Sequence, residues 1–143
     1  MSLSGVGKIL GGRKTLNTDV KSRMDLVALG RRGISKAALI KLASYLDRSV
    51  GEMASILPVG ERTIQRYRRD QRFKSNVSEH ILQIAEVAAR GEEVFGDRDK
   101  LLAWLGLPSA ALGGETPGAL LGSRFGAELV LEELGRIEHG VVV

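Results

Sequence analysis

The sequence predicts an all-α protein in which a helix-turn-helix domain is followed by a small helical domain. Apolar residues recur at the i, i+3, i+4 and i+7 spacing of a helix from about residue 22 onward, and no stretch alternates apolar and polar residues for long enough to form a strand. Apolar residues make up 43% of the 143-residue chain, which is enough for a core. We expect three parts, which are an N-terminal arm (1–20), the helix-turn-helix domain (21–74) and the second helical domain (75–143).

The first part shows no clear helical period. Glycines stand at positions 5, 7, 11 and 12, and basic residues stand at positions 8, 13 and 14. Closely spaced glycines favour a flexible backbone over a regular element. We therefore expect residues 1–20 to form a mobile arm, or a segment that becomes ordered only in an assembly.

Two successive helices are predicted next, each beginning at a serine. Ser35 is placed to cap a helix that runs to about Asp47. Ser49 is placed to cap the next helix, and Glu52 follows three residues later, which is the spacing of a capping box. Pro58 ends this second helix. The apolar face of the first helix is formed by Leu39, Leu42, Ala43 and Leu46.

A third helix is predicted from about Gly60 to about Arg69, with Thr63, Ile64 and Tyr67 facing inward. Two short helices joined by a tight turn are typical of a helix-turn-helix, whose second helix enters the major groove of DNA. Arg and Gln on its outer side can donate hydrogen bonds to guanine and adenine edges. The alternative is an ordinary solvated basic face. The predicted DNA contacts on and just after this helix are Arg62, Gln65, Arg66, Arg68, Arg69 and Arg72.

The charge of the chain divides unevenly between its halves. Residues 1–74 hold 16 Lys and Arg against 6 Asp and Glu, a net charge of +10, whereas residues 75–143 hold 5 against 11, a net charge of −6. A basic half is suited to a polyanion such as DNA, because cations neutralise its phosphates. The acidic half is suited to a different partner.

The second half is predicted to be helical as well. Ser78 is placed to cap a helix that runs to about Arg90 and ends at Gly91. Asp97 or Asp99 opens a helix that contains Trp104, which we expect in the core. A further helix starts at Thr116-Pro117, where Thr caps and Pro occupies the first position. The last helix runs from about Phe125 to Glu138, with Val130, Leu134 and Ile137 inward and Glu128, Glu132, Glu133 and Arg136 outward.

Several functional classes are excluded or unsupported. The chain has no cysteine, which excludes disulfides and thiolate chemistry, and no apolar run approaches the ~18 residues that span a membrane. The N-terminus has no secretory signal pattern, so we expect a cytoplasmic protein. His80 and His139 are the only histidines and lie far apart in the sequence, so no metal site is expected. Because no catalytic motif is present, we expect no enzyme activity and no cofactor.

Motifs spread over residues 20–143 resemble one known family. They are LPVGERTIQRY (57–67), VFG (94–96), WL (104–105), ALGGETP (111–117), LL (120–121), FG (125–126), Leu134 and RIEHG (136–140). In this order and spacing they resemble the Xre/MbcA/ParS antitoxins, small bacterial proteins of type II toxin–antitoxin pairs. The family carries an Xre-like helix-turn-helix followed by a toxin-binding domain.

The resemblance implies both partners. The family's partners are RES-domain toxins, which act on NAD by degrading it or by transferring ADP-ribose. The resemblance implies that the acidic half covers or distorts the active-site entrance of such a toxin. It also implies that the basic half binds operator DNA and represses the shared operon. Because one short helix reads too few bases, we expect a homodimer within a larger toxin–antitoxin complex, with the second domain as a possible dimerisation surface.

The last predicted turn and the tail are the candidate toxin contacts. An apolar tail on a soluble protein favours a docking partner. The alternative is a solvated last turn in which Glu132 and Arg136 form an ordinary i,i+4 ion pair. At the level of function, the alternative is a stand-alone dimeric transcription regulator without a toxin partner. The candidate toxin contacts are Arg136, Glu138, His139, Val141, Val142 and Val143.

Overall fold

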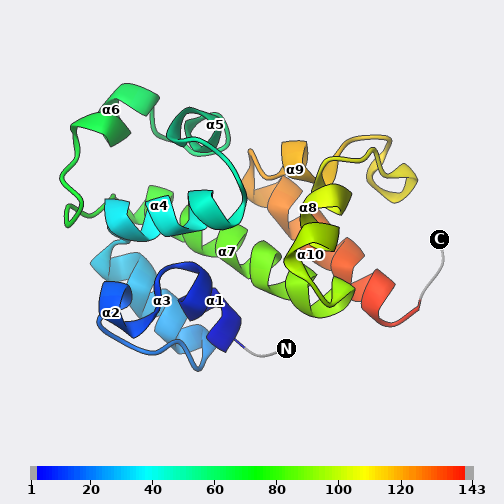
Figure 1. The fold of residues 1–143 in the computed structure, drawn as a ribbon, viewed down its shortest axis with the longest axis horizontal. Helices are drawn as coiled ribbons and strands as arrows, with labels where there is room; N and C mark the ends of the chain where they lie inside the picture. The colour runs from blue at the N-terminus through cyan, green and yellow to red at the C-terminus, as the bar shows by residue number, and fades with distance from the viewer. Residues whose placement is uncertain (1–2, 141–143) are drawn as a thin grey trace.

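The computed structural model describes residues 3–140, and all regular elements of this part of the chain are helices (Figure 1). Within it there is no β-strand, only one isolated antiparallel bridge between Ser35 and Arg72. The predicted all-α fold is therefore confirmed. The elements in chain order are α1 (Ser4–Ile9), α2 (Gly12–Leu16), α3 (Arg23–Arg32), α4 (Lys36–Tyr45), α5 (Val50–Ala54), α6 (Glu61–Arg66), α7 (Ser75–Phe95), α8 (Arg98–Leu105), the 3-10 helix η1 (Ala110–Leu112), α9 (Pro117–Leu120) and α10 (Arg124–Glu138).

Helix α7 is the central element. It has 21 residues and packs against α1, α3, α8 and α10, so elements from both halves of the chain cover it. Figure 1 shows α1–α3 on one side of this helix and α8–α10 around its other end. Its buried residues lie on several faces, which is typical of a helix enclosed by neighbours rather than one on the surface. They include Val77, Ile81, Ile84, Ala85, Val87, Ala88 and Ala89.

The N-terminal segment, expected to be a mobile arm or to become ordered only in an assembly, is packed into the core of the single chain over residues 3–20. Val6, Leu10 and Leu16 are almost completely buried, and α1 packs on α7. The glycines allow a close approach rather than mobility: a Cβ added to Gly5 would lie 3.2 Å from the Cβ of Ala89 on α7. Helices α1 and α2 have only six and five residues, which is too short for a helical period of apolar residues to show in the sequence.

Serine side chains cap three helices of the basic half, α3, α4 and α5, and two of these caps were predicted. The hydroxyl of Ser35 accepts from the backbone N–H of Ala38, and the Ser49–Glu52 capping box is present. The backbone N–H of Ser49 donates to the Glu52 carboxylate and lowers its pKa. A second capping box, between Ser22 and Asp25, opens α3. These contacts satisfy backbone donors that would otherwise be left unpaired.

The prediction for the first helix of the acidic half has the wrong ends. Helix α7 begins at Ser75, and the buried Ser78 links other elements instead of capping. Its hydroxyl accepts from the N–H of Ile34 at 2.8 Å and donates to the carbonyl of Phe73 at 3.1 Å. Gly91 lies inside the helix, where a Cβ would collide with Leu101 of α8. The helix ends at Gly96, which has a left-handed φ of 84°.

The later helix starts agree with the sequence. Asp97 caps α8, and Thr116 caps α9 with Pro117 at the first position. Two residues of helix α10 differ in burial from the prediction. Ile137, expected inward, is 36% exposed, and Glu133, expected outward, is buried at 6% exposure. Among residues 3–140, no helix is both long and apolar enough to cross a bilayer.

Arg98 joins the two halves. At the first position of α8, its Nε donates to the carbonyl of Tyr45 at 2.6 Å, and Nη2 donates to the carbonyl of Ser44 at 3.3 Å. The guanidinium also lies 5.5 Å from the centre of the Tyr45 ring. A cation at the last carbonyls of α4 stabilises that helix end, so the contact fixes α8 to the basic half. Burial raises the pKa of Tyr45, so its hydroxyl stays neutral.

Substituting alanine for two glycines of α10 is expected to change the free energy of unfolding in opposite directions. A Cβ on Gly126 would collide with the backbone carbonyl of Leu120, whereas one on Gly135 would meet only Nη2 of Arg90, at 4.0 Å. We expect Gly126→Ala to lower the free energy of unfolding by about 1–3 kcal/mol, because the backbone at Leu120 must move to make room for the new Cβ. We expect Gly135→Ala to raise it by about 0.5–1 kcal/mol, because alanine favours a helix. Urea denaturation followed by circular dichroism measures the free energy of unfolding of both variants. Equal effects of the two substitutions would contradict the difference in packing between Gly126 and Gly135.

Candidate functional site

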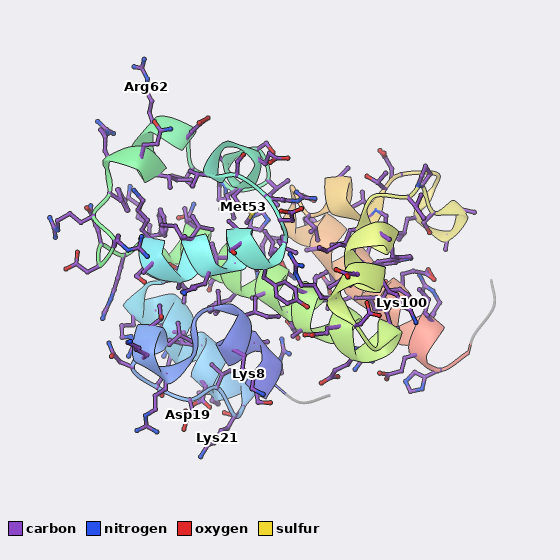
Figure 2. The ribbon with its side chains drawn as sticks, viewed as in Figure 1. Lys8, Asp19, Lys21, Met53, Arg62 and Lys100 are labelled. Atoms are coloured by element: carbon purple, nitrogen blue, oxygen red, sulfur yellow. The ribbon has the colours of Figure 1, made fainter. Side chains whose placement is uncertain are left out.

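The pair α5 and α6 forms the predicted helix-turn-helix. Met53 of α5 and Ile64 of α6 are completely buried and hold the two short helices together. Helix α6 lies at the edge of the molecule, and Figure 2 shows Arg62 pointing away from the body of the protein. Only one of the six side chains of α6, that of Ile64, is fully buried. The other faces of the helix are therefore open to solvent. The helix can therefore approach a large ligand.

The outward stripe of α6 is shorter than predicted. Arg62, Gln65 and Arg66 are exposed on the helix, as expected. The helix ends at Arg66, however, and Tyr67 is already extended, with ψ at 142°. Arg69 therefore lies in the turn that follows and does not continue the helical stripe. Its side chain is exposed beside those of Arg68 and Arg72, which also lie beyond the helix.

Aromatic stacking explains why α6 ends early. The rings of Tyr67 and Phe73 stack with their centres 4.9 Å apart, and Phe73 is buried at 4% exposure. Burying both rings requires the chain to leave the helix at Tyr67 and return at Phe73. The N–H of Phe73 then donates to the carbonyl of Ile34 at 2.9 Å. Stacking of this kind contributes about 0.5–1.5 kcal/mol beyond burial.

Lys36 of α4 fixes the carboxyl end of α6. Its Nζ donates to the carbonyl of Tyr67 at 2.9 Å and to the carbonyl of Gln65 at 3.3 Å. The half-buried ammonium of Lys36 therefore binds backbone carbonyls and does not face solvent. A cation at the negative end of a helix stabilises that end. Lys36 therefore positions the recognition helix, and the sequence spacing gave no sign of this role.

The predicted toxin contacts at the chain end are partly engaged within the protein. Arg136 pairs with Glu133 at 3.1 Å, one turn earlier, in place of the expected pair with Glu132. Glu138 accepts from Arg90 of α7 at 2.9 Å. His139 is exposed. Val141, Val142 and Val143 lie outside the described residues, so their predicted role stays a prediction.

Helix α10 exposes an apolar face that the sequence reading did not single out. Phe125 is 83% exposed and Leu129 is 47% exposed, and together with Glu128 and Glu132 they line a shallow hollow of about 390 Å³. We call these four residues the α10 face. Their i, i+3, i+4 and i+7 spacing places them on one side of α10, outside its buried stripe. A phenylalanine this exposed favours contact with another protein.

The remaining candidates have structural roles. Trp104 is half-buried and packs against Phe95, with the ring centres 5.4 Å apart. Nε2 of the buried His80 lies 2.8 Å from the carbonyl oxygen of Leu121. In the described part of the chain, no three His, Cys, Asp or Glu residues gather closely enough to hold a metal ion.

Comparisons with known proteins agree with both halves of this architecture. The model of the antitoxin Xre-like helix-turn-helix domain matches residues 25–86. The model of the antitoxin Xre/MbcA/ParS C-terminal toxin-binding domain matches residues 90–140. An Antitoxin Xre from Yersinia enterocolitica is 35% identical over 113 residues, which cover 78% of this chain and 76% of that protein. The chain belongs to the Xre family of antitoxins.

A second Xre antitoxin supports the full length of the match. The Antitoxin Xre of Photorhabdus laumondii is 28% identical over 131 residues, which cover 90% of this chain and 88% of that protein. The two family models meet inside α7, between residues 86 and 90. This Xre antitoxin therefore has a helix-turn-helix half and a toxin-binding half that share one long helix. The resemblance to the family is confirmed, whereas the pairing with a RES-domain toxin stays a prediction.

The role of Lys36 in this Xre antitoxin can be tested without DNA. We expect Lys36→Met to speed hydrogen exchange of the α6 amides about fivefold, because about 1 kcal/mol of capping is lost at the helix end. Lys41→Met is the matched control, since Lys41 lies exposed on the same helix and its side chain binds neither carbonyl at the end of α6. Mass spectrometry of peptides that cover residues 57–67 measures the rates. Equal rates in both variants would remove Lys36 from this role.

Proposed function

We propose that this Xre antitoxin neutralises a RES-domain toxin that acts on NAD, and that it represses the shared operon by binding operator DNA. The observation that best supports the proposal is the presence of two unlike surfaces on the two family domains. The helix-turn-helix half exposes a row of cations on and after α6, and the toxin-binding half exposes the acidic and apolar α10 face. Under this proposal the chemistry on NAD belongs to the toxin.

The DNA-binding surface consists of α6 and the turn that follows it. Arg62, Gln65 and Arg66 are the residues that can reach base edges, because α6 is the exposed second helix of the motif. Arg68, Arg69 and Arg72 lie beyond the helix end and are suited to phosphates, which cations bind without reading sequence. Six helical residues read few base pairs. A homodimer bound to two half-sites supplies the missing specificity.

The toxin-binding surface is centred on the α10 face. An aromatic side chain surrounded by acidic residues is a good anchor for a partner whose pocket has a basic rim. A basic rim at the entrance of an NAD site attracts the pyrophosphate of the substrate. The acidic α10 face therefore complements the entrance of an NAD site. The proposal assigns further toxin contacts to Arg136, Glu138, His139, Val141, Val142 and Val143, the last three of which lie outside the described residues.

Co-expression with the product of the adjacent reading frame tests the proposal. A stable complex on size-exclusion chromatography, together with restored growth, is the expected result. A neighbouring product that is harmless, or toxic but neither bound nor neutralised, would favour a stand-alone dimeric transcription regulator. The two cases also differ in the operon that is repressed. An antitoxin represses the operon that encodes its own toxin, whereas a stand-alone regulator has no toxin partner.

Arg66→Ala separates the two functions. We expect operator binding to weaken by about 1–3 kcal/mol, because one contact to a base edge is lost, while growth rescue stays at the wild-type level. Arg31→Ala is the matched control, since Arg31 is an exposed arginine of the same half at the end of α3. Fluorescence anisotropy with an operator duplex measures the affinity. Normal affinity of the Arg66 variant would exclude this residue from the DNA surface.

The double substitution Phe125→Ser and Leu129→Ser tests the toxin surface. We expect the dissociation constant for the toxin to rise by a factor of about 30 or more, because buried aromatic anchors contribute about 2 kcal/mol or more to an interface. Leu107→Ser is the control, since Leu107 is 60% exposed elsewhere in the same half. Thermal melting should be unchanged in both variants, because all three side chains are exposed. Neutralisation at the wild-type level by the double variant would refute the assignment.

A further inference from the structure

A basic cleft lies beside the helix-turn-helix. It has a volume of about 470 Å³ and is lined by residues of α2, the α3–α4 turn, α4 and the segment 69–72. One acidic residue, Asp70, stands among its lining residues. The cationic side chains that line it are Lys14, Arg32, Lys41, Arg69 and Arg72. We call these five residues the basic cleft.

The charge of the basic cleft is not balanced within the protein. Asp70 pairs with Arg68, at 3.3 Å, which is not a lining residue. Arg32 donates to the backbone carbonyl of Leu16. The other four cationic side chains form no ion pair with any residue in the range 3–140. Like charges brought together from four segments of the chain repel one another and oppose folding. Their arrangement therefore favours a negatively charged partner.

The fold fixes the basic cleft next to the recognition helix. Arg69 follows the last residue of α6 by three positions, and its carbonyl accepts from the N–H of Ala37 at 2.9 Å. The carbonyl of Gln71 accepts from the N–H of Lys36 at 2.9 Å. These bonds hold the segment after α6 against the start of α4. In Figure 1 this segment runs down the edge of the molecule from α6 toward α4 and α2.

We propose that the basic cleft binds the phosphate backbone of DNA beside the base pairs that α6 reads. The proposal rests on the operator binding proposed above and extends its surface to Lys14 of α2 and Lys41 of α4. Neither lysine lies on the α5–α6 pair, and Lys14 precedes residues 25–86, which match the helix-turn-helix domain. Flexible lysines make point-charge contacts to phosphates, which strengthen binding to any sequence and orient the protein on the duplex. The N-terminal helices thus take part in DNA binding as well as in the core.

The exposure of these side chains favours DNA over a small anion. A small-molecule site buries most of its ligand among buried polar groups. Lys14, Lys41, Arg69 and Arg72 are all exposed, so they surround the cleft without enclosing a ligand. Such an open row of cations is suited to a long polyanion that passes across it.

The salt dependence of DNA binding tests the proposal. Each lost phosphate contact reduces the slope of log K against log salt concentration by about 0.9, so Lys14→Gln with Lys41→Gln should reduce it by about 1.8. The loss should be the same on the operon's promoter duplex and on an unrelated duplex. The matched control is Lys8→Gln with Lys21→Gln, which removes the same charge from the same half. Both control lysines are exposed and line no part of the basic cleft, and Figure 2 shows them at the opposite edge of the view from Arg62.

Three results would overturn the proposal. The first is an unchanged slope in the cleft variant, and the second is an equal loss in the control variant, which would indicate net charge alone. The third is binding of inorganic phosphate or ATP to the wild-type protein that the cleft variant loses while its DNA slope stays normal, which would indicate a small-anion site. If the wild-type protein does not prefer the promoter duplex, operator binding fails, and the slope on the unrelated duplex still tests the basic cleft.

Discussion

The enclosure of α7 is the constraint on which the rest of this structure depends. A 21-residue helix with apolar side chains on several faces must be covered around most of its circumference, because each exposed large apolar side chain would forfeit about 1.5–3 kcal/mol. Helices from before and after it in the chain supply that cover. The N-terminal segment is therefore part of the core. The two family domains consequently share one helix.

The recognition helix depends on its surroundings for its position. Six residues cannot form a stable helix alone, so α6 is held by the burial of Ile64, by Lys36 at its carboxyl end and by the aromatic stack that follows. The hydroxyl of Ser78 then ties both neighbouring segments to the first turn of α7, through Ile34 and Phe73. The proposed DNA-binding surface is thus oriented by polar contacts whose partners lie far apart in the chain.

Local signals in the sequence predicted the helix starts and missed these distant contacts. Ser35, Ser49 and Thr116 cap helices through bonds to residues three positions later, so spacing alone reveals them. Ser78 has the same local appearance, yet it bonds across 44 residues to Ile34. The end of α6 at Arg66, which places Arg69 off the helix, depends on Phe73, beyond the predicted element. Of the candidate site, the basic row was predictable, whereas the basic cleft required α2 to be placed beside it.

The two candidate surfaces share no residue, and this limits how one partner can influence the other. DNA at α6 and the basic cleft would contact none of the side chains of the α10 face, so the two ligands do not compete for the same atoms. Coupling between them can pass through α7, through the bonds of Arg98 to the end of α4, or through the assembly of several copies. Of these three routes, the one through Arg98 is the easiest to remove by mutation. A single side chain forms all of its hydrogen bonds between the halves. The packing of α7 is instead distributed over many side chains, so it transmits strain as a rigid unit.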